Sequence, residues 1–178
     1  MTITRIIRAA DCPEVPWKNG GCTTREIAVF PSGAGMGDFL WRLSMARVEQ
    51  AGPFSAFDGV DRTLAVIAGS LALTGPGIAV RLDPGSPPFP FGGGVAVHGE
   101  PLGEPVLDLN AMVRSGHCAC TMTRLAAGDL ATSTGTGFFV ALEAQTVSGS
   151  ALGRLDCIRF AGSVTAAGAG LFVDFVPD

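Results

Sequence analysis

Apolar and polar residues alternate with a period of two over several parts of the chain. The pattern is clearest over 41–48 (WRLSMARV) and 106–114 (VLDLNAMVR). A period of two places successive side chains on opposite faces of the backbone, as in a β-strand. The apolar spacing of an amphipathic helix is not sustained over any window of about a dozen residues. The sequence therefore predicts an all-β fold with little helix.

Two stretches of the chain resemble each other. Residues 64–74 and 138–148 each show a strand, a turn and a second strand, and each is predicted to form a hairpin. Arg-Leu-Asp follows the first stretch at 81–83 and the second at 154–156, an offset of 156 − 83 = 73 residues. This offset indicates a weak internal duplication.

The duplication predicts two fused antiparallel halves, each a β-barrel or sandwich. A half of this length buries a sheet face poorly by itself, so the two halves are expected to share a core. We place them at about 1–83 and 95–178, joined by the Pro/Gly-rich segment 84–94. The content of 25 glycines and 12 prolines is also typical of short strands with tight turns.

Charge and composition exclude several classes of partner. The net charge is −4 and no run of Lys or Arg is present, so neither nucleic acid nor an anionic membrane is an expected partner. The N-terminal residues lack the apolar core of a signal peptide, which predicts a cytoplasmic protein. The uncharged stretch 63–80 is broken by Gly, Ser and Pro and does not predict a membrane span. Five cysteines do not form a secreted disulfide framework, so reduced thiols are expected.

No cofactor or metal is predicted. The two histidines, His98 and His117, lack the spacing of a metal site, and Cys118 and Cys120 have no second cluster of ligands to complete four. The segment PWKNGG fails as a phosphate-binding loop because Lys18 precedes the glycines and 23–30 has the pattern of a strand. Gly-x-Ser-x-Gly is absent, so nucleophilic catalysis has no motif to support it.

Residues 106–114 provide the most informative candidate surface. The odd positions are apolar, whereas Asp108, Asn110, Met112 and Arg114 share the opposite face. That face either contacts solvent or lines a ligand cavity, and the alternation alone does not decide between them.

Several arginines could give such a cavity a preference for anions. If Arg42, Arg62 and Arg114 line it with Lys18 near the rim, carboxylates such as Glu26 must pair with part of them. Any positive charge that remains selects an anionic ligand, because a guanidinium offers a planar bidentate match to a carboxylate.

Five blocks of sequence occur together in one order: PWKNGGCTTREI at 16–27, WRLS at 41–44, GPFS at 52–55, GVDR at 59–62 and DLNAMVR at 108–114. With these blocks the chain resembles the HutD/Ves family. The resemblance implies a bicupin fold and a role associated with bacterial histidine utilisation or stress response, with no firm enzymatic activity. It also implies a pocket formed by the polar residues of these blocks, namely Lys18, Asn19, Thr24, Glu26, Arg42, Ser44, Arg62, Asp108, Asn110 and Arg114.

Three functions follow as alternatives. The leading hypothesis is a non-catalytic binding protein with a regulatory or accessory role, whose ligand is a small carboxylate such as urocanate or a formylated glutamate. The second is a metal-independent isomerase or hydrolase with Glu26 or Asp108 as general base. The third is an interaction module with a collapsed barrel. A homodimer formed through exposed strands is also expected.

Overall fold

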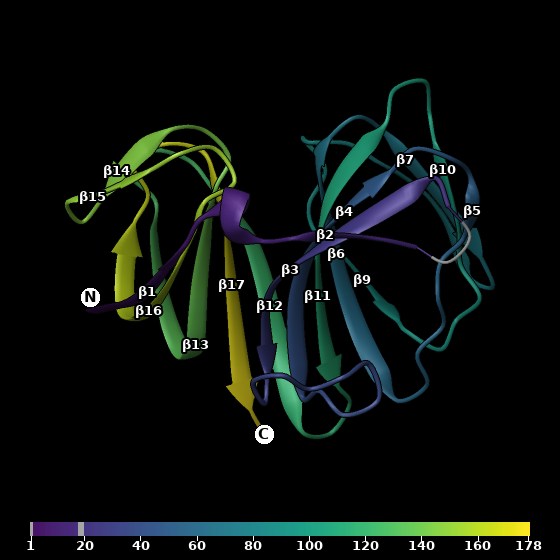
Figure 1. Ribbon diagram of the computed structural model, residues 1–178, viewed down its shortest axis with the longest axis horizontal. Coiled ribbons are helices and arrows are strands. Elements are labelled where there is room, and N and C mark those ends of the chain that lie inside the picture. The colour runs from purple at the N-terminus through teal and green to yellow at the C-terminus, as the bar shows by residue number, and fades with distance from the viewer. Residues whose placement is uncertain (1, 18–19) are drawn as a thin grey trace. The chain divides into compact units, whose positions relative to one another are not determined.

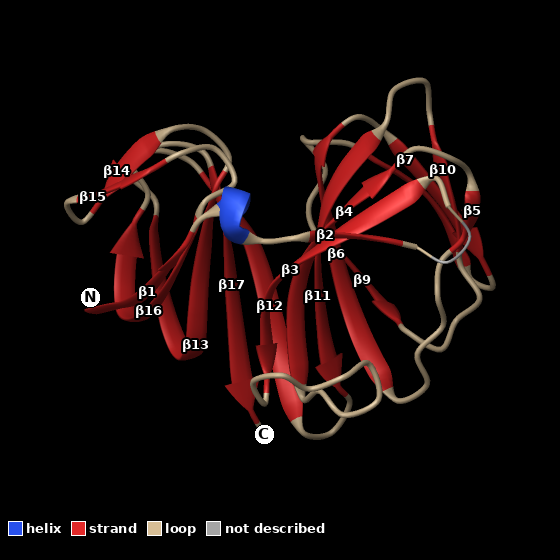
Figure 2. Cartoon of the chain, viewed as in Figure 1, coloured by secondary structure: helices blue, strands red, loops and turns tan. Residues whose placement is uncertain are grey.

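The structure is a computed structural model that describes residues 2–17 and 20–178. Strands make up most of it, and the one helix of the described residues is the 3-10 turn η1 (Ala9–Asp11) (Figures 1 and 2). None of the described helical segments has the length and apolar character needed to cross a membrane. The predicted all-β fold is confirmed. The chain forms two compact units, which we describe separately.

Unit 1 comprises the chain up to Cys12 together with Gly116–Asp178. Its main sheet is antiparallel, with the order β1-β16-β13-β17-β12 (Figure 1). Unit 1 also contains a two-stranded sheet, β14-β15. Phe139, Phe160 and Phe172 pack in the hydrophobic core of the unit. The bounds are β1 Thr2–Ile7, β12 Cys118–Leu125, β13 Leu130–Ala141, β14 Gln145–Val147, β15 Ser150–Leu152, β16 Cys157–Thr165 and β17 Gly170–Pro177.

Unit 2 comprises Pro13–Ser115 and contains two antiparallel sheets. One has the order β2-β3-β4-β11-β6-β9 and the other β5-β10-β7-β8. Leu64 and Val66 of the first sheet belong to one core with Leu71 and Leu73 of the second, so the two sheets enclose an interior. The bounds are β2 Glu14–Pro16, β3 Cys22–Phe30, β4 Trp41–Val48, β5 Gly52–Pro53, β6 Val60–Ala68, β7 Leu71–Gly75, β8 Ile78–Leu82, β9 Phe89–Gly92, β10 His98–Pro101 and β11 Val106–Arg114.

The two predicted hairpins contain the expected strands but are not hairpins. β6 and β7 lie in different sheets, as do β13 and β14. At Gly69, where φ is +80°, the chain passes from one sheet to the other, and a Cβ there would lie 2.7 Å from the carbonyl oxygen of Pro105. The hairpins are instead β7–β8 and β14–β15.

The units also differ from the halves expected at 1–83 and 95–178. The segment 84–94 is not a connector, because it contains β9, which pairs with β6 in the main sheet of unit 2. The N-terminal strand β1 pairs with β16 and therefore belongs to unit 1. The bounds of the two units are therefore determined by pairing between strands that are distant in sequence.

Candidate ligand site in the interior of unit 2

The register of the main sheet in unit 2 aligns polar side chains from neighbouring strands. Residues paired directly across strands point to the same face, with Cβ atoms about 5 Å apart. The aligned face includes Leu64 and Val66, which belong to the core between the two sheets, so it faces the interior. From β3 through β4 and β11 to β6, its successive rows are Thr24, Ala46, Asp108 and Val66; then Glu26, Ser44, Asn110 and Leu64; then Val29, Arg42, Met112 and Arg62.

Asp108 and Asn110 are buried in these rows with polar atoms that have no partner. Asp108 is 1% exposed, and neither of its carboxylate oxygens accepts a hydrogen bond from the described residues. The side-chain oxygen of Asn110 is also buried and accepts no hydrogen bond from the described residues. Buried polar atoms almost always have a partner, since leaving one without a hydrogen bond costs about 1–3 kcal/mol. These oxygens mark a place where a hydrogen-bond donor is needed.

Burial dominates the electrostatics of Asp108. It raises the pKa of this carboxyl to about 7, and the nearby positive charge of Arg62 offsets only part of the rise. No ion pair within 4 Å joins the two residues in the described structure. A carboxyl group with this pKa exchanges a proton near neutral pH.

Arg62 lies in an aromatic environment. Its guanidinium carbon is 5.0 Å from the ring centroid of Phe91, 5.6 Å from that of Phe54 and 5.8 Å from that of Phe57. Nη1 donates to the carbonyl oxygen of Ser55 (3.1 Å), whereas Nε has no acceptor among the described residues. Burial lowers its pKa to about 10, with Asp108 opposing and Arg42 adding to the effect, so the side chain remains a cation at neutral pH.

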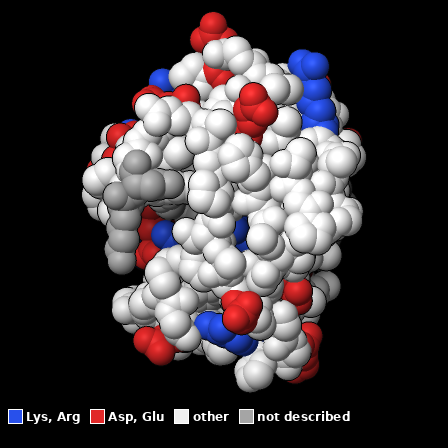
Figure 3. Space-filling view, turned by 90° about the vertical axis from the view of Figure 1, so that its right-hand side faces the viewer, with Lys and Arg blue, Asp and Glu red and all other residues white. Residues whose placement is uncertain are grey.

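The second arginine of the aligned rows is already paired. Nε of Arg42 donates to Oε2 of Glu26 at 2.8 Å, and Nη1 approaches the Ser44 hydroxyl at 3.4 Å. The Glu26 side chain is 43% exposed and that of Arg42 13%, so this pair lies nearer solvent than Asp108 does. Figure 3 shows unit 2 from the right-hand side of Figure 1, with a few charged atoms near the middle of the view recessed among uncharged ones.

A cavity of about 200 Å³ lies beyond the Thr24 end of the polar rows, and Arg62, Asp108 and Asn110 are not among its lining residues. Cys22 and Val48 line it and are paired one row beyond Thr24 and Ala46, while Phe54 contributes to the cavity and to the environment of Arg62. It presents polar and apolar surface in similar amounts, and its lining residues are Trp17, Gly20, Cys22, Val48, Gln50, Ala51, Gly52, Pro53 and Phe54. The ring of Phe54 is therefore common to the cavity and to the environment of the Arg62 guanidinium.

Comparison with known proteins identifies the family. The family model described as HutD matches residues 9–170. The chain belongs to the HutD family. The resemblance to HutD and Ves proteins is therefore confirmed.

Curated relatives agree with this assignment. An uncharacterised 21.2 kDa protein from the hutC 3′ region of Pseudomonas putida is 42% identical over 91 residues, which are 51% of this chain and 45% of that protein. Protein Ves of Citrobacter koseri is 36% identical over 104 residues, 57% of this chain and 53% of its own. The chain spans about half the length of these curated relatives.

Solved structures agree over nearly the whole chain. HutD from Pseudomonas fluorescens SBW25 superposes with a TM-score of 0.87 at 30% identity, covering 98% of each chain. A cupin 2 barrel protein from Leptotrichia buccalis gives 0.60 at 8% identity, covering 100% of this chain and 98% of that one, and shows the fold alone. The predicted bicupin architecture is confirmed, with open sandwich-like sheets rather than closed barrels.

The structure brings together most of the residues predicted for the HutD pocket. Glu26, Arg42, Ser44, Asp108 and Asn110 share the inner face with Arg62. Thr24 shares it too, but its hydroxyl accepts a 2.6 Å hydrogen bond from the indole Nε1 of Trp17. Lys18 and Asn19 lie outside the described residues.

Two predicted residues of β11 have other contacts. Met112 stands between Arg42 and Arg62 in register, and its side chain packs with Phe39 and Val60. Arg114 donates to the carbonyl oxygens of Gly37 (2.9 Å) and Phe39 (3.5 Å). Arg114 therefore holds the β3–β4 loop and does not join Asp108.

The cysteine pair of the sequence lies in unit 1. Burial raises the pKa of Cys120 to about 12, and burial also raises that of Cys118, so both are thiols at neutral pH. Within residues 2–17 and 20–178, no three His, Cys, Asp or Glu side chains cluster as metal ligands would. A reactive thiolate is not favoured at this pair.

Proposed function

We propose that this HutD-family chain is a non-catalytic binding protein for a small carboxylate metabolite, with an accessory role in histidine utilisation. The pathway is supported by the family and by similar proteins, which include HutD of Pseudomonas fluorescens and a protein from the hutC 3′ region of Pseudomonas putida. The ligand class follows from the chemistry of the inner face of unit 2.

One observation carries the proposal. A buried guanidinium with a free Nε donor faces the same interior as the carboxyl of Asp108 and the amide oxygen of Asn110, which have no partners in the described structure. A ligand carboxylate satisfies the donor of Arg62, and an N–H or O–H of the same ligand satisfies the acceptors. The cavity beyond the Thr24 end of the rows takes the rest of the molecule.

Small metabolites that combine a carboxylate with an N–H group fit this arrangement. Urocanate carries an imidazole, and N-formyl-L-glutamate carries an amide. Thermal unfolding with each compound tests the proposal. At about 100 times its dissociation constant, a ligand adds about 2.7 kcal/mol to stability, which raises the midpoint by roughly 5–10 °C for a chain of this size. An unchanged midpoint with every carboxylate contradicts the proposal.

Replacing Arg62 by glutamine is expected to weaken binding of these carboxylates by roughly 10- to 100-fold, because a charge-assisted hydrogen bond contributes about 1.5–3 kcal/mol. Isothermal titration calorimetry measures the change. Arg81→Gln is the matched control, since Arg81 lies on β8 with an exposed side chain. Equal affinities of the two variants would show that Arg62 does not contact the ligand.

The pKa of Asp108 supports a second candidate, a metal-independent enzyme. A carboxyl group with a pKa of about 7 is suited to act as a general base or acid at neutral pH. Incubation with the same metabolites, followed by chromatography of the products, tests this function. Turnover that disappears in Asp108→Asn would favour the enzyme, and unchanged metabolites would favour the binding protein.

A further inference from the structure

We propose that the site binds its carboxylate together with one proton, and that Asp108 holds this proton. The inference rests on the proposed function and adds to it a dependence on pH. It also identifies Asp108 as the residue that determines the charge state in which the complex forms.

The position of Asp108 is the first support. Its carboxyl group is buried on the inner face, and no described residue donates a hydrogen bond to either oxygen. The corresponding core of unit 1 also contains a buried carboxylate, Asp174, but four donors from Ser133, Thr134 and Gly135 surround that group. Asp108, in contrast, does not stabilise the fold by accepting hydrogen bonds from the described residues.

The balance of charge around Asp108 is the second support. Three charged side chains lie on the aligned face near it, namely Arg62 on β6, Arg42 on β4 and Glu26 on β3. Arg42 and Glu26 form an ion pair with each other. From the opposite sheet the interior receives Leu71, Leu73 and Leu82, which carry no charge. Outside the ion pair, the described residues leave one cation, Arg62, and one carboxyl, Asp108, with the thiol of Cys22 on β3 as a further titratable group.

An anion that binds Arg62 therefore meets a second negative charge when Asp108 is ionised. Two carboxylates in one buried site do not both stay ionised, because each raises the pKa of the other. Uptake of a proton by Asp108 removes the repulsion and turns one oxygen into an O–H donor, which can hydrogen-bond to the bound carboxylate. The bound state then has Arg62 as donor on one side of the anion and Asp108 as donor on the other.

The dependence on pH has a definite sign. Before an anion binds, the pKa of Asp108 is already raised to about 7 by burial, and the anion raises it further. Below pH 7 Asp108 already carries the proton, so affinity stays level. Above pH 7 each binding event takes up about one proton, so affinity falls by about tenfold per pH unit until the pKa of the complex is reached.

Calorimetric titration of the wild-type chain with N-formyl-L-glutamate provides the direct test. The carboxylates of this probe stay ionised between pH 6 and 9 and do not contribute protons. At pH 8, heats in two buffers of different ionisation enthalpy are expected to show uptake of about one proton per bound probe. Affinity is expected to be roughly tenfold weaker at pH 8.5 than at pH 7.5. Acetate at millimolar concentration serves as a second probe.

The variant Asp108→Asn assigns the proton. It is expected to bind with an affinity that no longer changes with pH, while Asp61→Asn, which alters an exposed carboxylate on β6, keeps the wild-type dependence. Binding without proton uptake in the wild-type chain overturns the inference and leaves the binding function intact, even if Asp108→Asn fails to fold. A pH dependence that persists in Asp108→Asn overturns it as well. Failure of both probes and of urocanate to bind at any pH overturns both proposals.

Discussion

Replacing Asp174 by alanine is expected to destabilise the fold by roughly 3–5 kcal/mol, because buried donors lose a charged acceptor and stay unsatisfied. Asp174 is 3% exposed on β17. Its carboxylate accepts hydrogen bonds from the Ser133 hydroxyl at 2.7 Å, from the Thr134 backbone N–H at 2.8 Å and hydroxyl at 3.1 Å, and from the Gly135 N–H at 3.4 Å. Unfolding in urea measures the loss.

The donors to Asp174 come from an irregular part of β13, which explains why the effect should be concentrated there. Register with β16 shifts between Ser133 and Gly137, so amides in this interval cannot all pair with the neighbouring strand. Hydrogen exchange should therefore accelerate in β13 and β17. Asp129→Ala is the control, since the carboxylate of this exposed residue accepts one hydrogen bond, from Ala126 N–H at 2.8 Å. Similar losses in both variants would show that the carboxylate of Asp174 does not stabilise the irregular segment.

The alternation of apolar and polar residues was sufficient to predict the central strands. β4 and β11 have the bounds expected at 41–48 and 106–114. Alternation did not predict the environment of the polar face, because both faces of β11 are buried. A strand at the centre of a six-stranded sheet takes its burial from its neighbours, which the sequence of the strand does not describe.

The strand pattern did not limit the candidate site along the strand. Asp108 and Arg114 share a face, but six residues of extended chain separate their Cα atoms by about 20 Å. One small ligand does not reach both, and Arg114 contacts the loop between β3 and β4 instead. A period of two thus predicts which residues share a face of the strand, but it does not predict which of them are close enough to contact one ligand.

The aromatic environment of Arg62 could not be predicted from local patterns. Phe54 and Phe57 come from the segment between β5 and β6 and Phe91 from β9, and the two segments meet at Arg62 only after β9 has paired with β6. Phe54 depends in turn on Gly99, because a Cβ at that position would overlap its ring. The sequence block at 52–55, which contains Phe54, indicated the family but did not predict the contact between Phe54 and Arg62.

The sequence also could not separate Asp108 from Asp174. Both are aspartates within β-strands that lie in the middle of a sheet, and both are buried. The difference is in the donors: Asp174 accepts four hydrogen bonds from an irregular strand, whereas neither carboxylate oxygen of Asp108 accepts a hydrogen bond in the described structure. Partner residues distant in sequence decide which aspartate has its hydrogen bonds satisfied within the fold and which does not.

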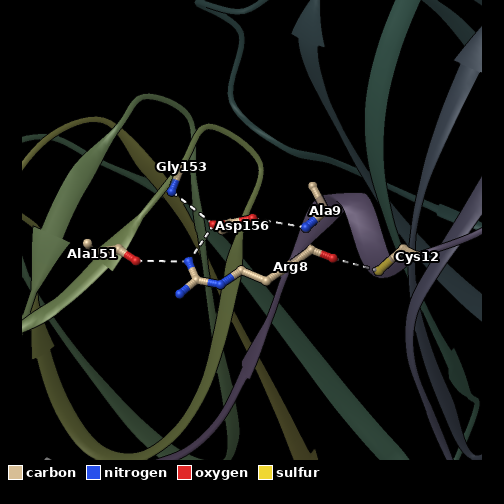
Figure 4. A network of polar contacts seen from close by, with 6 residues as sticks. All are labelled: Arg8, Ala9, Cys12, Ala151, Gly153 and Asp156. Carbon is tan, nitrogen blue, oxygen red and sulfur yellow. Dashed lines mark hydrogen bonds and ion pairs between the residues drawn. The ribbon is translucent and has the colours of Figure 1, made fainter.

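A third aspartate, Asp156, forms hydrogen bonds with the N-terminal segment within unit 1 (Figure 4). Asp156 accepts hydrogen bonds from the guanidinium of Arg8 (2.7 Å), the backbone N–H of Ala9 (2.9 Å) and the backbone N–H of Gly153 (2.9 Å). The same guanidinium of Arg8 donates to the carbonyl oxygen of Ala151 at 2.8 Å. Burial by itself would raise the pKa of Asp156, but the three hydrogen bonds outweigh it and hold the pKa below its ordinary value.

Asp156→Ala is expected to cost about 3 kcal/mol at neutral pH, because two backbone donors and an arginine lose their charged acceptor. A carboxyl whose pKa is lower in the folded chain stabilises it above the ordinary pKa of about 3.9, and this contribution is lost as the pH falls further. The difference in unfolding free energy between wild type and variant should therefore be largest above pH 5 and shrink toward pH 2. Urea unfolding across this range measures it, with Asp11→Ala as a control on an exposed side chain of the same segment. A difference that stays constant with pH would show that the carboxylate charge of Asp156 does not hold the segment in place.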